Sequence, residues 1–161
     1  MKKLILIRHA KSSWDAPLKD SDRPLDNRGI KDAHLVAAQV IHLLPKTFLM
    51  FSSTAKRASE TAIIFAQNFL YPIENIVFKE ELYTFDGNSL ERIVKSFNNK
   101  YDNVILFGHN EAITNFVNKF GDIFIENVPT SGFVSLKFDS DNWKFIDKGK
   151  TIEIVFPKDL K

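Results

Sequence analysis

The chain has 161 residues, 44% of them hydrophobic and 26% charged, which is the composition of one ordinary domain with a sizeable apolar core. The formal net charge is +2 with both signs interspersed, which argues against a nucleic-acid-binding face. The chain has no cysteine, and this excludes disulfides, thiolate metal sites and cysteine-based phosphatase or protease chemistry.

The N-terminal segment has two lysines and then only four consecutive aliphatic residues, too few for the apolar core of a signal peptide. No apolar run approaches the roughly twenty residues of a membrane-spanning helix. We therefore expect a cytoplasmic protein without a membrane partner.

The first predicted strand covers residues 4–7, an aliphatic run short enough for a strand buried on both faces. Arg8 and His9 follow it directly, at the carboxyl end, where open α/β sheets bind ligands. A cation beside an imidazole there indicates an anion site with a nucleophile or base. The alternative is a basic pair that only keeps a strand end solvated.

Residues 12–27 are polar with two prolines and predict a long loop, and loops of this length tend to be functional. Beyond it, helix-like and strand-like stretches alternate. The predicted helices cover residues 30–44, 58–69, 90–97 and 113–120, and the predicted strands cover 48–51, 76–78 and 104–107. Ser52, Ser53 or Thr54 could cap the second helix.

From residue 133 onward the apolar pattern has period two, which predicts antiparallel strands at one edge of the sheet. These strands would include residues 133–138, 143–145 and 152–156. We find no internal repeat or linker and expect one α/β domain over residues 1–161. Its central sheet would be mostly parallel, with helices on both faces and antiparallel C-terminal edge strands.

Basic side chains follow three of the predicted parallel strands. Arg8 and His9 come after the first, Arg57 after the second and His109 after the fourth. Because the carboxyl ends of parallel strands meet at one edge, these cations would converge and would need an anion to offset their repulsion. Phosphate fits best, since the planar fork of arginine matches its oxygens. A helix beginning near Thr54 would add its positive end.

Three motifs resemble the histidine phosphatase superfamily, which has the phosphoglycerate mutase-like fold. They are a strand followed by R-H-A at residues 8–10, the run S-x-A-x-R-A-x-x-T from Ser53 to Thr61, and a strand followed by Gly108 and His109. Within that superfamily, the small size and the run D-R-P-L-x-x-R-G at residues 22–29 are most similar to the SixA-type phosphohistidine phosphatases.

The resemblance implies roles for four residues. His9 would attack phosphorus through a neutral ring nitrogen and carry the phosphoryl group transiently. Arg8 and Arg57 would hold the equatorial oxygens and offset the charge of the transition state. His109 would donate a hydrogen bond to the same group. No metal or other cofactor is required, because cationic side chains supply the charge.

Other residues are open to two interpretations. Arg23 is a further candidate for phosphate or substrate binding, but it could simply pair with Asp22 or Asp26. Ser131, with Thr130 before it, could line the pocket. We take His34 and His42 as ordinary residues of the first helix.

The general acid decides the substrate class. Many members of the superfamily that cleave esters use a carboxylate from the loop after the third strand, and Glu81 is the nearest match, with Glu80 and Asp86 as alternatives. Phosphohistidine has a better leaving group and needs an acid less. The small chain and its open site favour a phosphorylated side chain on a partner protein.

Two alternatives remain. One is a general small-molecule phosphomonoesterase with Glu81 as its acid, in which Glu81→Gln would slow ester hydrolysis about a hundredfold. The other is a non-catalytic phosphate-binding module.

Overall fold

The aliphatic run at the start of the chain forms β1 (Lys2–Arg8), an interior strand of a six-stranded sheet. The structure is a computed structural model, and it describes residues 1–161. The strand order is β3-β2-β4-β1-β5-β6. The other strands are β2 (Leu49–Ser53), β3 (Val77–Lys79), β4 (Asn103–Gly108), β5 (Phe133–Phe138) and β6 (Lys150–Val155). The first four strands are mutually parallel, and β5 and β6 run antiparallel at one edge. The predicted fold class is confirmed.

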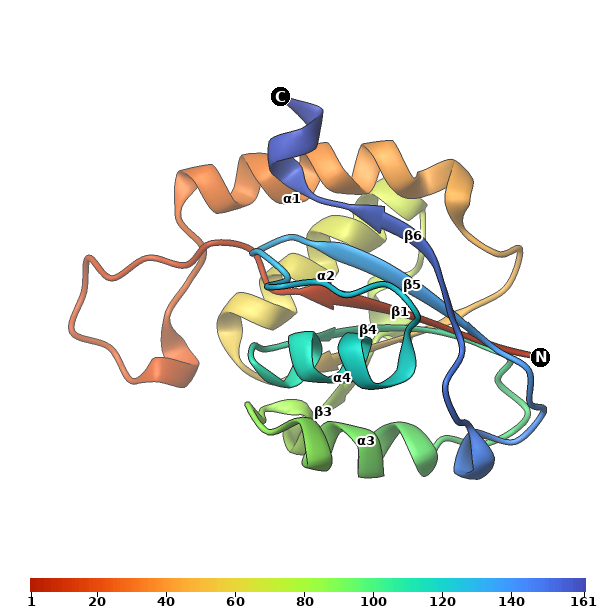
Figure 1. Cartoon of the computed structure of the whole chain (residues 1–161). Helices are drawn as coiled ribbons and strands as arrows, with labels where there is room; N and C mark the ends of the chain where they lie inside the picture. Colours follow the sequence, from red (N-terminus) through yellow and green to blue (C-terminus); the bar gives the residue numbers. More distant parts are fainter.

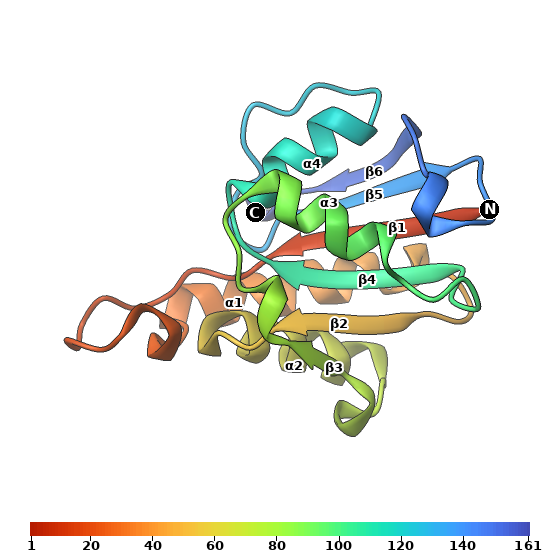
Figure 2. The same cartoon turned by 90° about the horizontal axis from the view of Figure 1, so that it is seen from below.

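Two pairs of helices cover the sheet. Helices α1 (Asn27–Val40) and α2 (Lys56–Phe69) pack on one face, and α3 (Gly87–Lys95) and α4 (Ala112–Phe120) pack on the other (Figures 1 and 2). Aspartates are the N-cap residues of α1 and α3: the side chain of Asp26 accepts a hydrogen bond from the backbone N–H of Gly29, and that of Asp86 accepts one from the backbone N–H of Asn88. No helix has both the length and the apolar character needed to cross a membrane.

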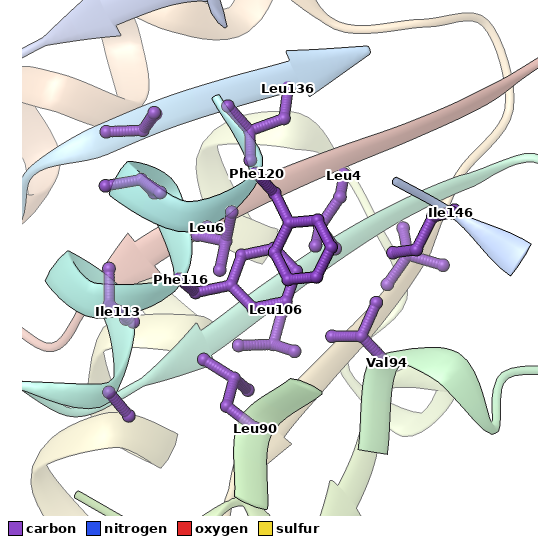
Figure 3. Packing of buried hydrophobic residues seen from close by; sticks show 14 of the residues in the cluster. Leu4, Leu6, Leu90, Val94, Leu106, Ile113, Phe116, Phe120, Leu136 and Ile146 are labelled. Atoms are coloured by element: carbon purple, nitrogen blue, oxygen red, sulfur yellow. The ribbon is translucent and has the colours of Figure 1, made fainter. Parts of the chain in front are cut away.

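The side chains of β1 alternate between two apolar cores, as the period of a strand requires. Leu4 and Leu6 belong to the core beneath α3 and α4, where Phe116 packs near them (Figure 3), and Ile5 and Ile7 belong to the core beneath α1 and α2. All four β1 side chains are at most 1% exposed, and each such burial contributes roughly 2 kcal/mol. The strand is therefore a rigid support for whatever follows it.

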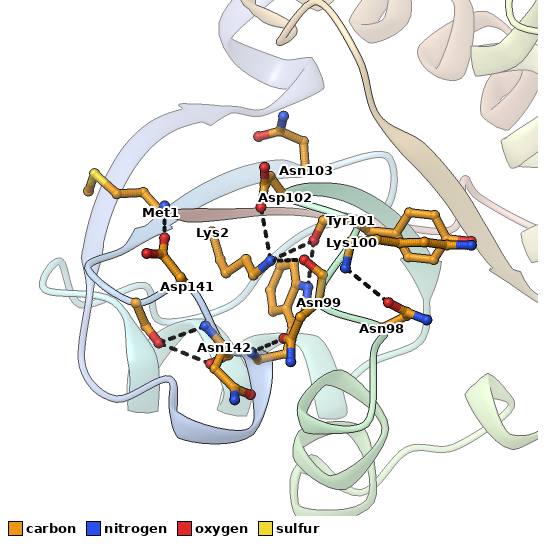
Figure 4. A network of polar contacts seen from close by, with 12 residues as sticks. Met1, Lys2, Asn98, Asn99, Lys100, Tyr101, Asp102, Asn103, Asp141 and Asn142 are labelled. Atoms are coloured by element: carbon orange, nitrogen blue, oxygen red, sulfur yellow. Dashed lines mark hydrogen bonds and ion pairs between the residues drawn. The ribbon is translucent and has the colours of Figure 1, made fainter.

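The N-terminal end of β1 holds a buried cation. The Lys2 ammonium, 1% exposed, donates to the carbonyl oxygens of Asn99 at 2.6 Å and Tyr101 at 3.1 Å and to a carboxylate oxygen of Asp102 at 2.9 Å (Figure 4). Its three protons thus have three acceptors.

The predicted strand at residues 143–145 is wrong. These residues form a 3₁₀ helix, η5 (Trp143–Phe145), which the side chain of Asn142 caps by accepting from the N–H of Lys144. Trp143 is fully buried edge-on against Phe97, with ring centres 5.5 Å apart, whereas Phe145 is 68% exposed. A local turn that buries one large ring produces the same apolar spacing as a short strand.

The long loop predicted over residues 12–27 covers residues 9–26 and projects from the body at the carboxyl end of β1 (Figure 1). One bridge between Ser12 and Leu25 closes its base, and a 3₁₀ helix, η1 (Asp20–Asp22), lies farther along it.

Candidate active site

The carboxyl ends of β1, β2 and β4 bring the predicted basic residues together. Arg8 lies in register with Gly108 on the neighbouring strand, so His9 and His109 leave the sheet side by side. Their ring centres are 5.3 Å apart. Arg57 lies in the first turn of α2, the helix that follows β2, and its guanidinium reaches Asp20 of the long loop.

His9 has a defined tautomer. Its Nδ1 lies 2.7 Å from the carbonyl oxygen of Ala10, which can only accept, so Nδ1 carries the proton and Nε2 of the neutral ring has a free lone pair. Burial first, and with it the cations Arg57, Arg8 and Arg23, lower the pKa of His9 to about 4 against the opposing effect of the Ala10 hydrogen bond. The ring is therefore neutral, with a nucleophilic nitrogen, at neutral pH.

His109 is 1% exposed. Its ring lies about 5 Å from those of His9, Tyr83 and Phe85, at centre distances of 5.3, 5.2 and 5.3 Å. Nε2 is 2.8 Å from the hydroxyl oxygen of Ser53, and Nδ1 is buried without a partner. Burial first, then the charges of His9 and Arg57, lower the pKa of His109 to about 3.

The two arginines each leave a buried Nε–H without an acceptor. Arg8 donates from Nη1 to the carbonyl of Val128 at 2.9 Å. Arg57, 2% exposed, donates from Nη1 to the carbonyl of Asp20 at 2.7 Å and from Nη2 to the carboxylate of Asp20 at 2.9 Å. Buried donors without partners are rare in folded proteins, and here they face the same edge of the sheet.

Asp20 was not among the predicted site residues, and it is the acidic partner of the cluster. Its carboxylate accepts from Arg57, from Arg23 at 3.3 Å and from the hydroxyl of Tyr83. The Tyr83 hydrogen bond and then Arg57 hold its pKa down to about 2, against the effect of burial. The only sequence signal was an acidic residue near Arg23 in a long loop, which does not distinguish Asp20 from Asp22 or Asp26.

Arg23, 6% exposed, is built into the site rather than solvated. Its Nη1 donates to the hydroxyl of Ser12 at 2.8 Å, and its guanidinium carbon lies 3.4 Å from the centre of the Trp14 ring. Its acidic partner is Asp20, not the Asp22 or Asp26 that the sequence offered.

A cavity of about 310 Å³ opens beside His9 and the arginines, and His109, buried next to His9, does not itself line it. Its lining includes Arg8, His9, Asp20, Arg23, Arg57 and Thr130, together with the exposed rings of Trp14 and Phe85. The charged side chains of the lining are all cationic except Asp20, which suits a small anion carried on a larger molecule. No group of three or more histidine, aspartate or glutamate side chains is arranged to hold a metal ion.

Glu81 lies outside this cavity. Its side chain is 61% exposed, pairs with Lys79 at 3.5 Å and lines a separate surface hollow with Ser89 and Arg92. The physical reason is the 3₁₀ turn η4 (Glu80–Leu82), which turns Leu82 into the core and leaves Glu81 facing solvent. The nearby Asp86 caps α3 instead. Tyr83 and Phe85 are the residues of this loop that reach His109.

Ser131 lies behind the site, while Thr130 lines the cavity. The backbone N–H of Ser131 donates to the carbonyls of Arg8 at 3.0 Å and His9 at 3.2 Å, and its φ of 60° is left-handed. Its hydroxyl is fully buried with no partner. Strained backbone of this kind is held in place by its surroundings and clusters at functional sites.

The expected serine or threonine cap of α2 is wrong. The N-cap residue is Ala55, without a side-chain hydrogen bond of its own. The hydroxyl of Ser53 accepts from the N–H of Ala55 at 3.2 Å, but it also reaches His109, a contact that the sequence did not reveal.

Comparison with known proteins gives a family match. Residues 4–103 match the family model described as histidine phosphatase superfamily (branch 1). An uncharacterised chloroplastic protein of Arabidopsis thaliana is 36% identical over 123 residues, which is 69% of this chain and 55% of that protein, so the chain spans about half the length of this relative.

Solved structures share the fold. The protein histidine phosphatase SixA, complexed with tungstate, is 21% identical with a TM-score of 0.79, covering 99% of both chains. A mycobacterial glucosyl-3-phosphoglycerate phosphatase, complexed with VO3, is 12% identical with a TM-score of 0.69, covering 96% of this chain and 97% of the other. At these identities the likeness concerns the fold alone.

Proposed function

Because the chain belongs to the histidine phosphatase superfamily, branch 1, we propose that it is a phosphatase that works through a covalent phosphohistidine on His9, most readily on phosphohistidine of a partner protein. The observation that carries the proposal is the state of His9. A buried, neutral imidazole with Nδ1 committed to the Ala10 carbonyl presents Nε2 as a nucleophile beside arginines.

The proposed reaction has two steps. In the first, Nε2 of His9 attacks phosphorus and an N–P bond forms. The bond to the leaving imidazole nitrogen breaks with its electron pair going to that nitrogen, and a proton from solvent lets the ring leave as neutral imidazole. In the second, water attacks the phosphorus, the bond to Nε2 breaks, a proton of the water passes to solvent, and inorganic phosphate leaves.

The cations would stabilise the charge that spreads over the equatorial oxygens. The unpartnered Nε–H groups of Arg8 and Arg57 are the donors available for this purpose. Both Nη groups of Arg57 are already bonded to Asp20. Arg57 would therefore offer its Nε–H first, and its full fork only if Asp20 moved away.

The charge state of the cavity supports a phosphoramidate substrate over an ester. Asp20 is the one carboxylate in the lining, and its pKa of about 2 leaves it ionised, without a proton for a leaving alkoxide. The exposed position of Glu81 does not supply that acid either. An imidazole leaving group needs it less.

The surroundings of the cavity support a protein partner. Trp14 is 76% exposed and Phe85 is 51% exposed, and both rings contact the cavity rather than closing it. Such a site can receive a side chain presented on a folded surface. A cytoplasmic location, and the absence of nucleic-acid and membrane partners, stay predictions.

The test compares phosphate release from a histidine-phosphorylated protein, a sugar phosphate and a nucleotide. We expect the first to be hydrolysed fastest by the parent chain. His9→Ala should release no phosphate, and His34→Ala, which changes an exposed histidine of α1, should match the parent.

The outcomes separate the parts of the proposal. Faster hydrolysis of the esters would overturn the substrate class and leave the mechanism standing. Absence of an acid-labile phosphoenzyme by mass spectrometry, in a parent chain that binds phosphate, would favour the non-catalytic binding module.

A further inference from the structure

The two ring nitrogens of His109 have opposite surroundings. Nε2 is 2.8 Å from the hydroxyl oxygen of Ser53, whereas Nδ1 is buried with no hydrogen-bond partner. A neutral imidazole carries one proton, so one nitrogen donates and the other accepts. The tautomer decides whether the unpartnered nitrogen is a donor or a bare lone pair.

The hydroxyl of Ser53 has two hydrogen-bond partners, and these determine where its proton lies. Its hydroxyl oxygen accepts from the backbone N–H of Ala55 at 3.2 Å, and its only other partner is Nε2 of His109. If Nε2 carried the proton, the hydroxyl would accept twice and its own hydrogen would be left in a fully buried position without an acceptor. If the hydroxyl donates to Nε2, every hydrogen of Ser53 has a partner.

We propose that Ser53 is a positioning residue that holds His109 in the Nδ1-protonated tautomer, so that its free Nδ1–H can donate to the phosphoryl group during transfer. The inference rests on the proposed function of the site. It explains why a buried ring nitrogen has no partner in the protein: the donor is kept for an oxygen of the ligand.

The charges of the site favour the same tautomer. An Nδ1 lone pair would repel the oxygens of a phosphoryl group, whereas an Nδ1–H attracts them. The neutral ring is also the relevant form, because burial lowers the pKa of His109 to about 3. Hydrogen-bonded partners of this kind commonly set which nitrogen of a catalytic histidine carries the proton.

The position of Ser53 makes the constraint rigid. It is the last residue of β2, next to Ser52, which pairs with Phe107 on β4 immediately before Gly108 and His109. The rings of His9, Tyr83 and Phe85 surround the imidazole and hinder a ring flip that would exchange its nitrogens. The backbone on both sides of the hydrogen bond is therefore held by one sheet.

The direct test is the tautomer itself. Nitrogen-15 NMR of the histidine rings at pH 7, with His109→Gln to assign the signal among the four histidines of the chain, should show the proton on Nδ1 in the parent. In Ser53→Ala the preference should be lost. A parent ring protonated on Nε2 overturns the proposal, whatever the variants do.

Kinetics test the consequence. Ser53→Ala should lower kcat about tenfold to a hundredfold, less than the roughly hundredfold to thousandfold loss on removing a transition-state donor, because the ring stays in place, with little change in KM. Ser53→Thr keeps the hydroxyl and should recover most of the rate. Ser52→Ala is the matched control, because that serine is equally buried but its hydroxyl donates to the carbonyl of Ser53 and does not contact His109.

The results distinguish this inference from the proposed function. If His9 never becomes phosphorylated while His109 holds its proton on Nδ1 only in the presence of the Ser53 hydroxyl, the reaction is wrong and the positioning is right. If the phosphoenzyme forms at the parental rate in Ser53→Ala, the positioning role is wrong and the reaction stands.

Discussion

The two ends of β1 both hold buried cations, but they differ in how their donors are used. At the N-terminal end, the Lys2 ammonium meets three acceptors at 2.6 to 3.1 Å. At the carboxyl end, the Nε groups of Arg8 and Arg57 and the Nδ1 of His109 have none. A buried charge with all its partners supports the fold, whereas buried donors without partners point to a functional site.

The difference follows from topology. At the Lys2 end, the turn before β4 brings the carbonyls of Asn99 and Tyr101 over the ammonium. At the other end, the chain leaves three parallel strands in different directions and opens a crevice. Only Asp20, from the long loop, enters it as an anion.

The sharpest test of the comparison removes a cation from the crevice. Arg57→Ala should lower kcat/KM about a thousandfold, because such an arginine stabilises the charge of the transition state. Arg57→Lys keeps the charge without the fork and should recover only part of the rate. Arg92→Ala, an exposed arginine on α3, serves as the control. A loss below tenfold in Arg57→Ala would show that its free Nε–H is not used.

Removing the cation at the opposite end should affect stability instead. Lys2→Met leaves the three acceptors without their donor and should lower the free energy of unfolding by about 2 kcal/mol. Urea denaturation measures this loss, and kcat/KM should stay at the parental value. A variant of unchanged stability and reduced activity would contradict the division between the two ends.

The histidines of the crevice predict an acid-side loss of stability. Burial lowers the pKa of His9 to about 4 and that of His109 to about 3 from an ordinary 6.5. Between pH 6.5 and pH 4 the unfolded chain therefore binds up to two more protons than the folded one, and stability falls as the pH falls, by about 2 kcal/mol per pH unit for the two rings together. Urea denaturation of a His9→Gln, His109→Gln double variant should show a flatter profile. Parallel profiles would mean that the rings are not neutral in the folded state.

The Asp20 carboxylate offsets part of the positive charge of the arginines in the crevice, and its removal should strengthen anion binding. Asp20→Asn removes a negative charge from Arg57 and Arg23, so inorganic phosphate should bind about fivefold more tightly by calorimetry, since one repulsive charge near the surface costs about 1 kcal/mol. Asp22→Asn changes the exposed neighbour and should bind as the parent does. Weaker binding in Asp20→Asn would mean that the carboxylate orders the arginines more than it repels the ligand.

The smallest effect is expected at Glu81. Its exposed side chain pairs with Lys79 and lies outside the cavity, so Glu81→Gln should change hydrolysis of either substrate class less than about twofold. A hundredfold loss with phosphate esters would restore Glu81 as the general acid and the phosphomonoesterase alternative with it.

The amino-acid sequence by itself determined the buried strands, the four main helices and the residue types that follow the parallel strands. Continuous apolar runs specify buried strands such as β1 and β4 wherever they occur, so Arg8, His9 and His109 could be placed at one edge from their order in the chain. The same reasoning places Arg57 at the start of a helix beside them. Residue type and backbone period are local properties, and the sequence states them directly.

Tertiary structure alone decided where the side chains of the turns point. Trp143 could have belonged to a strand, Ser53 could have capped a helix, and Glu81 could have faced the site, since the local pattern allows each of these. Tertiary packing decided each case. The Trp143 ring packs in the core against Phe97, the Ser53 hydroxyl contacts His109 at the end of another strand, and the burial of Leu82 leaves Glu81 facing solvent. Those contacts join residues far apart in the chain, so their contribution to stability cannot be predicted from the local sequence pattern.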